Sequence, residues 1–436
     1  MSLDNGRKWG VGYGLDAAVA AGFTSTLVVQ QAYVEARWLK GTLTIGAKEQ
    51  PMELKNQELS TGSQTLGINA RPVPQVRLAL PDYWAIPFTR NWVALKGHIS
   101  YGKTTDDGWQ KNFVSEHNRY TQGTLYHSKA GYLKIGPKNI TLELGVEMAC
   151  QFGGKSYWEV ERDNWQWVDN KSGLGAFKDA FFASGGDLGE TIYQNADGNQ
   201  LGSWVMRFNI DQATWNLGLY ADHYFEDHSS MFMMDYNGYG EGTEWNVKKN
   251  NRYFLYDFKD MMLGAELQLK HFDWLNDIVV EYLYTKYQSG PVYHDRTPSF
   301  SDHIGGNDDY YNHKLFTGWQ HWGQVMGNPL YRSPLYNRDG SIRVADNRFV
   351  AWHLGLSGQP MNPLRYRLLA TYQTGLGTYD RPFTGRQYNM SLLAEVSWQI
   401  LHGWQFRGAL AMDKGRLLGD NYGAQLTIIK SGILAK

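Results

Sequence analysis

The sequence contains only one cysteine, Cys150, among its 436 residues. A single thiol excludes an intramolecular disulfide and a zinc site built from cysteines, so we interpret Cys150 as a small apolar residue of the protein wall. No run of eighteen apolar residues occurs, which excludes a transmembrane helix. Charge of either sign is not in excess, with 42 basic and 43 acidic residues, so no nucleic-acid-binding surface is indicated.

An export signal is also missing from the start of the sequence. Met1 is followed by Asp4 and Arg7 rather than by an apolar core, and a strand-like pattern begins at Trp9. We interpret residues 1–436 as a single domain of a longer exported protein, with the signal upstream of Met1.

Aromatic residues and glycine are abundant, with 17 Trp, 28 Tyr and 48 Gly, which suits many strands, tight turns and membrane-interface rings. Large apolar residues alternate with Thr141, Glu143, Gly145 and Glu147 across residues 140–148. The same period of two recurs in runs of about ten residues, the length that a tilted strand needs to cross a bilayer. These runs lie at residues 215–222, 263–270, 350–357, 392–399, 404–413 and 422–429.

The connections between these runs alternate between short and long. Short links lie at residues 39–41, 136–138, 211–214, 271–275, 359–363 and 401–403, and long ones at 103–120, 154–200, 227–257, 287–342 and 379–386. Short turns on one side and long loops on the other are typical of outer-membrane barrels, whereas a soluble two-sheet sandwich, the alternative fold, has no reason to keep this parity. We predict an all-β fold: a transmembrane antiparallel β-barrel of 16–18 strands in the bacterial outer membrane. Residues 154–200 and 288–342 are its long extracellular loops, and residues 64–80 are one strand interrupted by Pro72 and Pro74.

In such a barrel the apolar residues of each strand face lipid and the alternate residues face the lumen. The inward set carries charges of both signs, whereas an open pore that steers one kind of ion would have a biased lining. We therefore predict ion pairs across an occluded lumen. The charge network comprises Glu143, Glu147, Arg207, Glu266, Glu281, Arg365, Arg367, Glu395 and Arg407, and the inward set also includes Lys129.

Residues 174–183 have the pattern of a short helix within a long loop, with Gly185 as the C-cap. Phe177, Phe181 and Phe182 lie on one face of this helix. We expect it to pack on the mouth of the barrel rather than to act as a mobile gate.

Carbohydrate binding needs flat aromatic faces for sugar rings together with amides and carboxylates for paired hydroxyls. The long loops supply both kinds of side chain, although the same aromatics can instead pack the loops shut over the lumen. The candidate binding residues are Asp308, Asp309, Tyr310, Tyr311, Asn312, His313, Trp319, Trp322, Trp158 and Trp165. The histidine spacing in this region matches no zinc signature, and we expect no metal and no cofactor.

Several segments, in order along nearly the whole chain, resemble the Wzi family of capsule-assembly outer-membrane proteins in the form found in Bacteroidetes. They are residues 30–35, 69–77, 125–127, 145–147, 181–187, 309–313, 318–319 and 327–330. The resemblance implies an occluded barrel of 18 strands that acts as a surface lectin for capsular polysaccharide. It also implies periplasmic helices and a first strand pair upstream of Met1. The chain departs from many outer-membrane barrels in ending on Lys436 rather than on an aromatic residue.

We therefore predict a Gram-negative cell-surface lectin that anchors or organises capsular polysaccharide and is not an enzyme. Its expected partners are that polysaccharide, outer-membrane lipid and the capsule export machinery, but not nucleic acid. The alternative is an outer-membrane channel for export or uptake of polysaccharide or solute. A glycan hydrolase is disfavoured, because the Cβ atoms of Glu143 and Glu147 would lie roughly 13 Å apart on one strand, beyond the carboxyl separation of ~6.5–9.5 Å in inverting enzymes.

Overall fold

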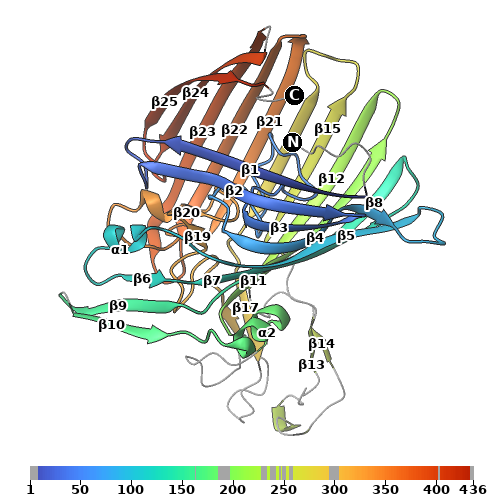
Figure 1. Cartoon of the computed structure of the whole chain (residues 1–436). Coiled ribbons are helices and arrows are strands. Elements are labelled where there is room, and N and C mark those ends of the chain that lie inside the picture. Colours follow the sequence, from blue (N-terminus) through green and yellow to red (C-terminus); the bar gives the residue numbers. More distant parts are fainter. Residues whose placement is uncertain are drawn as a thin grey trace.

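A computed structural model describes residues 8–162, 164–184, 197–226, 233–235, 242–244, 247, 252–254, 259–293, 304–400 and 403–432. Its main feature is one curved antiparallel sheet of sixteen strands, each paired with its neighbours in chain order (Figure 1). In order these are β1 (Trp9–Val19), β2 (Leu27–Trp38), β3 (Gly41–Ala47), β4 (Gln75–Ala85), β5 (Val93–Lys103), β7 (Leu125–Ile135), β8 (Ile140–Phe152), β11 (Asn199–Asp211), β12 (Trp215–Glu226), β15 (Met261–Leu269), β16 (Asp277–Tyr284), β21 (Phe349–Met361), β22 (Leu364–Gly377), β23 (Pro382–Ile400), β24 (Trp404–Gly415) and β25 (Asn421–Lys430).

The remaining elements lie in the connections. A three-stranded sheet is formed by β6 (Arg119–Gln122), β9 (Lys155–Glu161) and β10 (Asn164–Asp169). Short hairpins pair β13 (Met233–Asp235) with β14 (Arg252–Phe254), β17 (Ser289–Tyr293) with β18 (Ile304–Asn307), and β19 (Gln320–His321) with β20 (Gln324–Val325). The helical elements are α1 (Trp109–Phe113), α2 (Leu174–Phe182), η1 (Gly242–Glu244) and η2 (Pro334–Tyr336). Among the described residues, no helix has the length and apolar character needed to cross a membrane.

The sheet confirms the all-β outer-membrane fold and the lower predicted strand number. Alternate apolar side chains cover its outer face; in β1, for example, Val11, Tyr13 and Leu15 are exposed. The edge strands β1 and β25 do not pair with each other in the described structure, so the sheet is not closed into a barrel. Short turns join strands at one end, hereafter the turn side, and long connections join them at the other, hereafter the long-loop side.

Two predicted elements differ from the structure. Residues 64–74 are not part of a strand, and β4 begins only at Gln75, because Pro72 and Pro74 cannot donate hydrogen bonds to a ladder. The predicted loop helix is present as α2, but its C-cap is Ala183 in the left-handed conformation (φ 48°), and Gly185 lies outside the described residues.

Helix α2 packs against the outer face of the wall near its long-loop end. Ala176 and Ala180 contact Cys150 and Phe152 of β8. Lys129, predicted to face the lumen, instead lies on this outer face, where its ammonium donates to the carbonyl of Phe181. Cys150 is therefore a buried wall residue, covered by a helix rather than by lipid.

The concave side of the sheet is filled by two connecting segments. We call residues 48–74, between β3 and β4, the first inner segment, and residues 308–348, before β21, the second inner segment. The two segments bind each other: Asn328 Nδ2 donates to the Gly62 carbonyl at 2.8 Å, and Trp319 Nε1 donates to the Thr65 carbonyl at 3.3 Å. In Figure 1, β19 and β20 of the second segment lie between the N-terminal and C-terminal strands.

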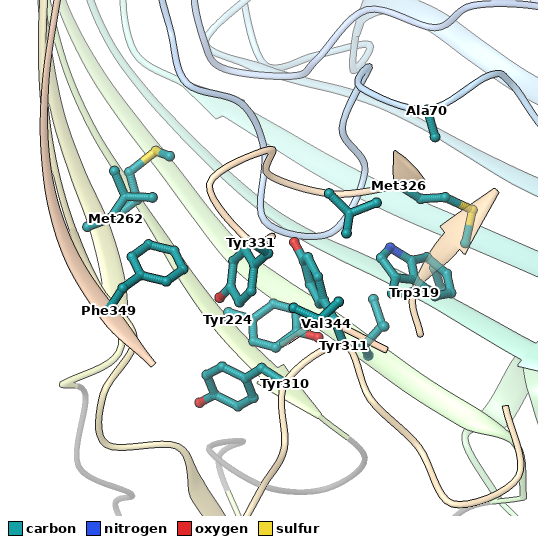
Figure 2. Close-up of a cluster of buried hydrophobic side chains, with 14 of the residues drawn as sticks. Ala70, Tyr224, Met262, Tyr310, Tyr311, Trp319, Met326, Tyr331, Val344 and Phe349 are labelled. Atoms are coloured by element: carbon teal, nitrogen blue, oxygen red, sulfur yellow. The ribbon is translucent and has the colours of Figure 1, made fainter. Parts of the chain in front are cut away.

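The largest apolar cluster lies in this interior, towards the long-loop side (Figure 2). Met262 of β15 and Phe349 of β21 contribute from the wall, and Tyr311, Trp319 and Tyr331 contribute from the second inner segment. The rings of Tyr311 and Tyr331 stack with centroids 4.0 Å apart. The core of this protein is therefore inside the curved sheet, and the loops themselves supply much of it.

The first inner segment also neutralises charges of the wall. Lys55 lies 2.8 Å from the carboxylate of Asp222 on β12, and both side chains are almost completely buried. Burial alone would lower the pKa of Lys55, but the carboxylates of Asp222, Glu147 and Glu281 raise it overall, so the ammonium stays charged. The segment passes so close to β21 that a Cβ on Gly355 would lie 2.6 Å from the Leu59 carbonyl oxygen.

Replacing Lys55 with methionine should therefore destabilise the protein strongly. The substitution keeps the length of the side chain but leaves Asp222 buried without its cation, a change that costs about 3–5 kcal/mol in other proteins. Thermal unfolding followed by near-UV circular dichroism in detergent should show a clearly lower Tm. Lys270→Met is the matched control, because Lys270 pairs with Asp211 in a partly exposed setting, where an ion pair contributes about 0–1 kcal/mol. Equal Tm values for the two variants would contradict this role of Lys55.

Candidate functional site in the lumen and on the long-loop side

The predicted luminal charges all lie on strands whose inward faces meet the inner segments. Arg207 binds Glu266 at 2.8 Å and donates to the Leu54 carbonyl of the first inner segment at 3.1 Å. Arg367 lies 3.3 Å from Glu395, and Arg407 lies 4.0 Å from the same carboxylate. Arg365 is more exposed and lies 3.9 Å from Glu58.

The inward carboxylates of the wall accept hydrogen bonds from both the wall and the first inner segment. Glu281 accepts from Ser60 Oγ at 2.5 Å, Thr61 N at 2.8 Å and Tyr220 Oη at 2.6 Å. Glu143 accepts from Tyr83 at 2.7 Å and lies 3.5 Å from Lys134. Such bonds explain why these charges are tolerated inside: each is matched by donors of the protein itself.

Three of the candidate sugar-binding aromatics lie in the interior cluster instead of on a surface. Tyr310, Tyr311 and Trp319 are all 0% exposed. Tyr310 donates to Asp260 at 2.9 Å, and burial together with the Asp260 carboxylate raises the pKa of its hydroxyl, which stays protonated. In this conformation these three rings present no face to a sugar, because the second inner segment folds into the lumen rather than over the mouth.

The polar candidates of the second inner segment hold its backbone in place. Asn312 donates to Asp309 Oδ1 at 3.1 Å and exchanges two hydrogen bonds with the backbone of Val344. Burial raises the pKa of Asp309, which also accepts from Asn347 at 2.6 Å. His313 Nδ1 accepts from the Leu315 backbone at 3.1 Å. Asp308 lies beside them and is partly buried.

The other three aromatic candidates lie on the long-loop side. Trp165 of β10 and Trp322 of the second inner segment belong to one cluster, which also contains Trp109 and Tyr120. The ring of Trp322 stacks on the Arg71 guanidinium at 4.2 Å. Trp158 of β9 is partly buried on the opposite face of the small sheet, paired in register with Gln166.

The small sheet brings aromatic residues of two loops into an arrangement that the sequence did not predict. Tyr120, Tyr157 and Trp167 are register partners across β6, β9 and β10 and therefore form one row on one face. The rings of Tyr120 and Tyr157 are stacked at 4.6 Å, and Trp167 follows at 6.4 Å. Exposure rises along the row, from 5% at Tyr120 to 56% at Trp167. We call these three residues the aromatic row.

A polar row runs beside the aromatic row on the same face. Gln122, Lys155 and Asp169 are also register partners across the three strands, two residues along from the aromatic row on each strand. All three are exposed, and Lys155 lies 3.3 Å from Asp169. Figure 1 shows β9 and β10 extending away from the large sheet on the long-loop side. The arrangement of a flat aromatic surface beside an amide, an ammonium and a carboxylate can bind a polar ligand with apolar faces.

The residues of the aromatic row can be found in the sequence, but the pairing of the strands that brings them together cannot. Tyr157 and Trp167 are ten residues apart, and only the hairpin pairing of β9 with β10 sets them side by side. Tyr120 lies further still along the chain, and nothing local indicates that β6 pairs with β9.

Comparison with known proteins identifies no family: no family model and no curated protein matches the chain. Several solved structures are similar to the chain at low identity and low TM-score. A loop L8 deletion mutant of OmpT, an outer-membrane protein of Vibrio cholerae, is 7% identical with a TM-score of 0.36, covering 96% of this chain and 85% of that one. The outer-membrane channel DcaP of Acinetobacter baumannii is 10% identical with a TM-score of 0.33, covering 97% and 79%. BamA of Haemophilus ducreyi lacking POTRA domains 1–3 is 11% identical with a TM-score of 0.36, covering 97% and 70%.

The sixteen alternating strands and their exposed apolar outer face are thus as predicted for an outer-membrane protein, with the sheet open between β1 and β25. The prediction that it is not an enzyme is corrected. Four of the similar structures are forms of OmpT, a name that outer-membrane proteases carry. At 7% identity the likeness assigns no activity to this chain.

The stability of the protein should depend on pH through a buried carboxyl of the second inner segment. Asp346 is buried, and burial raises the pKa of its carboxyl to about 7 although it accepts from the Gly377 backbone at 2.9 Å. Because the folded protein holds this proton more tightly than the unfolded chain, the contribution of Asp346 to stability is lost as pH rises from about 4 to about 7. Asp346→Asn should therefore gain about 1–3 kcal/mol over the native protein at pH 8, but not at pH 4.

Asp339→Asn is the matched control, with the opposite sign. Burial alone would raise the pKa of Asp339, but hydrogen bonds from Ser341 lower it below its usual value. This variant should be less stable than the native protein near neutral pH. Thermal unfolding at pH 4, 6 and 8 separates the two outcomes, and a constant difference between Asp346→Asn and the native protein at all three values would contradict the burial of that carboxyl.

Proposed function

We propose that this protein binds capsular polysaccharide at the cell surface and anchors or organises it there. The observation that carries the proposal is the aromatic row with its adjacent polar row on the long-loop side. Sugar rings stack their apolar faces on aromatic side chains, while their hydroxyls need amide and carboxylate partners. Trp167 provides the exposed aromatic face, and Gln122, Lys155 and Asp169 provide the polar partners.

The filled interior supports a binding role over free passage of solutes. The first inner segment reaches across the concave face from Lys48, paired with Glu35 of β2 at 2.5 Å, to Glu58, whose carbonyl accepts from Arg367 of β22 at 3.0 Å. The second inner segment fills the interior further, with the buried aromatic cluster towards the long-loop side. The resemblance of the sequence to the Wzi family supports capsule as the polysaccharide, and capsule export machinery remains a predicted partner.

Trp167→Ala should weaken binding of the purified protein to capsular polysaccharide from its own organism at least fivefold. The reason is the loss of stacking and apolar contact worth about 1–2 kcal/mol per ligand contact. Co-sedimentation with the polysaccharide, over a range of protein concentrations, measures the change. The small sheet keeps its buried residue Tyr120, so folding should be unaffected.

Trp274→Ala is the control for this experiment. Trp274 is similarly exposed, at 67%, but lies in the turn between β15 and β16 on the turn side. It should bind polysaccharide as the native protein does. If both variants, or neither, lose binding, the aromatic row is not the contact surface; if the native protein itself does not bind more than a porin does, the proposed function is wrong.

A channel for polysaccharide or solute is the second candidate, and one observation favours it. A groove of about 510 Å³ lies between the first inner segment and the inner face of β21–β24. Its walls include Glu58, Arg367, His353, Ser391 and Asp413, which are polar, together with apolar leucines of β22 and β23. Single-channel recording distinguishes the two functions: steady conductance through the intact protein would favour the channel.

A further inference from the structure

A second cavity lies on the inner side of the sheet, and no residue of the aromatic row lines it. It has a volume of about 100 Å³, enough for several water molecules or one small solute. One side is formed by the two limbs of the first inner segment, residues 48–53 and 66–73. The other side is the inner face of β4, β5, β7 and β8, represented by Arg77, His98, Ser128 and Glu147.

Most of the charged groups around this cavity already have partners. Lys48 is paired with Glu35, Glu53 with Lys96, and Glu49 accepts from Gln30 at 2.7 Å. Arg71 donates to the hydroxyls of Thr24 at 3.0 Å and Ser25 at 2.9 Å. These groups shape the cavity, and of their side-chain atoms only Arg71 Nε is buried without a partner in the described structure.

Arg77 is the exception among the cations. It lies on β4 between Val76 and Leu78, which face outward, so its side chain faces the lumen and lines the cavity. Within the described part of the chain, its guanidinium has neither an ion pair nor a hydrogen bond. A guanidinium carries five N–H donors in a planar fork that matches a carboxylate, and withdrawing it from bulk water without an acceptor is costly.

Two acceptors that line the same cavity are also without partners in the described structure. Glu147 is fully buried; its Oε1 accepts from Tyr132 at 2.8 Å, but its Oε2 has no donor. Gln75 Oε1, at the start of β4, is buried without a donor as well. The cavity therefore offers a cationic fork together with acceptors that require hydroxyl donors.

We propose that this cavity, which is partly open to solvent, binds the carboxylate end of a small hydroxylated carboxylate such as one hexuronic acid unit, while the rest of the sugar ring extends out of it. The carboxylate of the ligand pairs with the fork of Arg77, and its hydroxyls donate to Glu147 Oε2 and Gln75 Oε1. A bare inorganic anion would satisfy the guanidinium but bring too few donors, and a neutral sugar would satisfy the acceptors but leave the guanidinium unpaired. The site is separate from the aromatic row and does not rest on polysaccharide binding there.

Isothermal titration of the detergent-solubilised protein tests the proposal with four probes: sodium D-glucuronate, D-glucose, sodium acetate and inorganic phosphate. Glucuronate should bind at least tenfold more tightly than each of the other three, because it alone has both a carboxylate and several hydroxyls. Equal binding of acetate or phosphate would overturn the role of the hydroxyls, and equal binding of glucose would overturn the role of Arg77.

Arg77→Gln should reduce the affinity for glucuronate at least tenfold. Because Arg77 has no partner to lose in the described structure, this variant should fold normally, with a Tm equal to or above that of the native protein. Arg365→Gln is the matched control, since Arg365 also faces inward, on β22, but does not line the cavity. Gln75→Leu should weaken binding several-fold and leave acetate binding unchanged.

The proposal fails if the native protein does not bind glucuronate, or if Arg365→Gln loses as much affinity as Arg77→Gln. Trp167→Ala, which tests the polysaccharide surface, should bind glucuronate normally. Loss of polysaccharide binding with intact glucuronate binding therefore counts against the proposed function alone, and the reverse result counts against this site alone.

Discussion

The structure depends on one electrostatic constraint: a charge on the inward face of a membrane wall must find its partner inside the lumen. The outer face is apolar, so a strand turns such a side chain outward only where another element covers it, as α2 covers Lys129. Glu281 and Asp222 both satisfy this constraint with donors from residues 55–64 of the first inner segment, and Glu281 also accepts from Tyr220 of β12. The segment that occludes the interior therefore also neutralises the charges of the wall. The buried carboxylates of the wall and the inner segment stabilise each other.

The same constraint explains why the interior has a charged region around the first inner segment and an apolar region towards the long-loop side. Charged wall residues such as Arg207 and Glu266 bind the first inner segment, whereas the wall near the long-loop side presents Met262, Leu283 and Phe349. A connection that enters the lumen there can bury aromatic rings, and the second inner segment does so with Tyr311 and Trp319. Because the long loop is drawn inward, the surface proposed for ligand binding lies on β6, β9 and β10, outside it.

The alternating strands and the parity of turns could be predicted because both are local properties of the sequence. The environment of Lys129 could not be predicted from its own strand. Its side chain points outward, and the carbonyl that its ammonium binds comes from α2, about fifty residues later in the chain. The burial of Tyr310 and Tyr311 could not be predicted for a similar reason, since a loop rich in aromatic and polar residues has the same composition whether it folds over a mouth or into a lumen. The aromatic row was missed because a register between distant strands creates it.

Arg77 is an inward-facing charge that the inner segments do not pair. Inward arginines on distant strands, such as Arg207 and Arg367, are reached by carbonyls at the far bend of the first inner segment. Arg77 lies on β4, into which that same segment runs directly, and the two limbs of the segment diverge beside it and enclose the cavity. The carboxylate of Glu53, which lines the same cavity from the segment, pairs with Lys96 of β5 instead. Arg77 is thus without a partner in the described structure because of the path that the chain takes around it. The proposed ligand would supply the missing carboxylate.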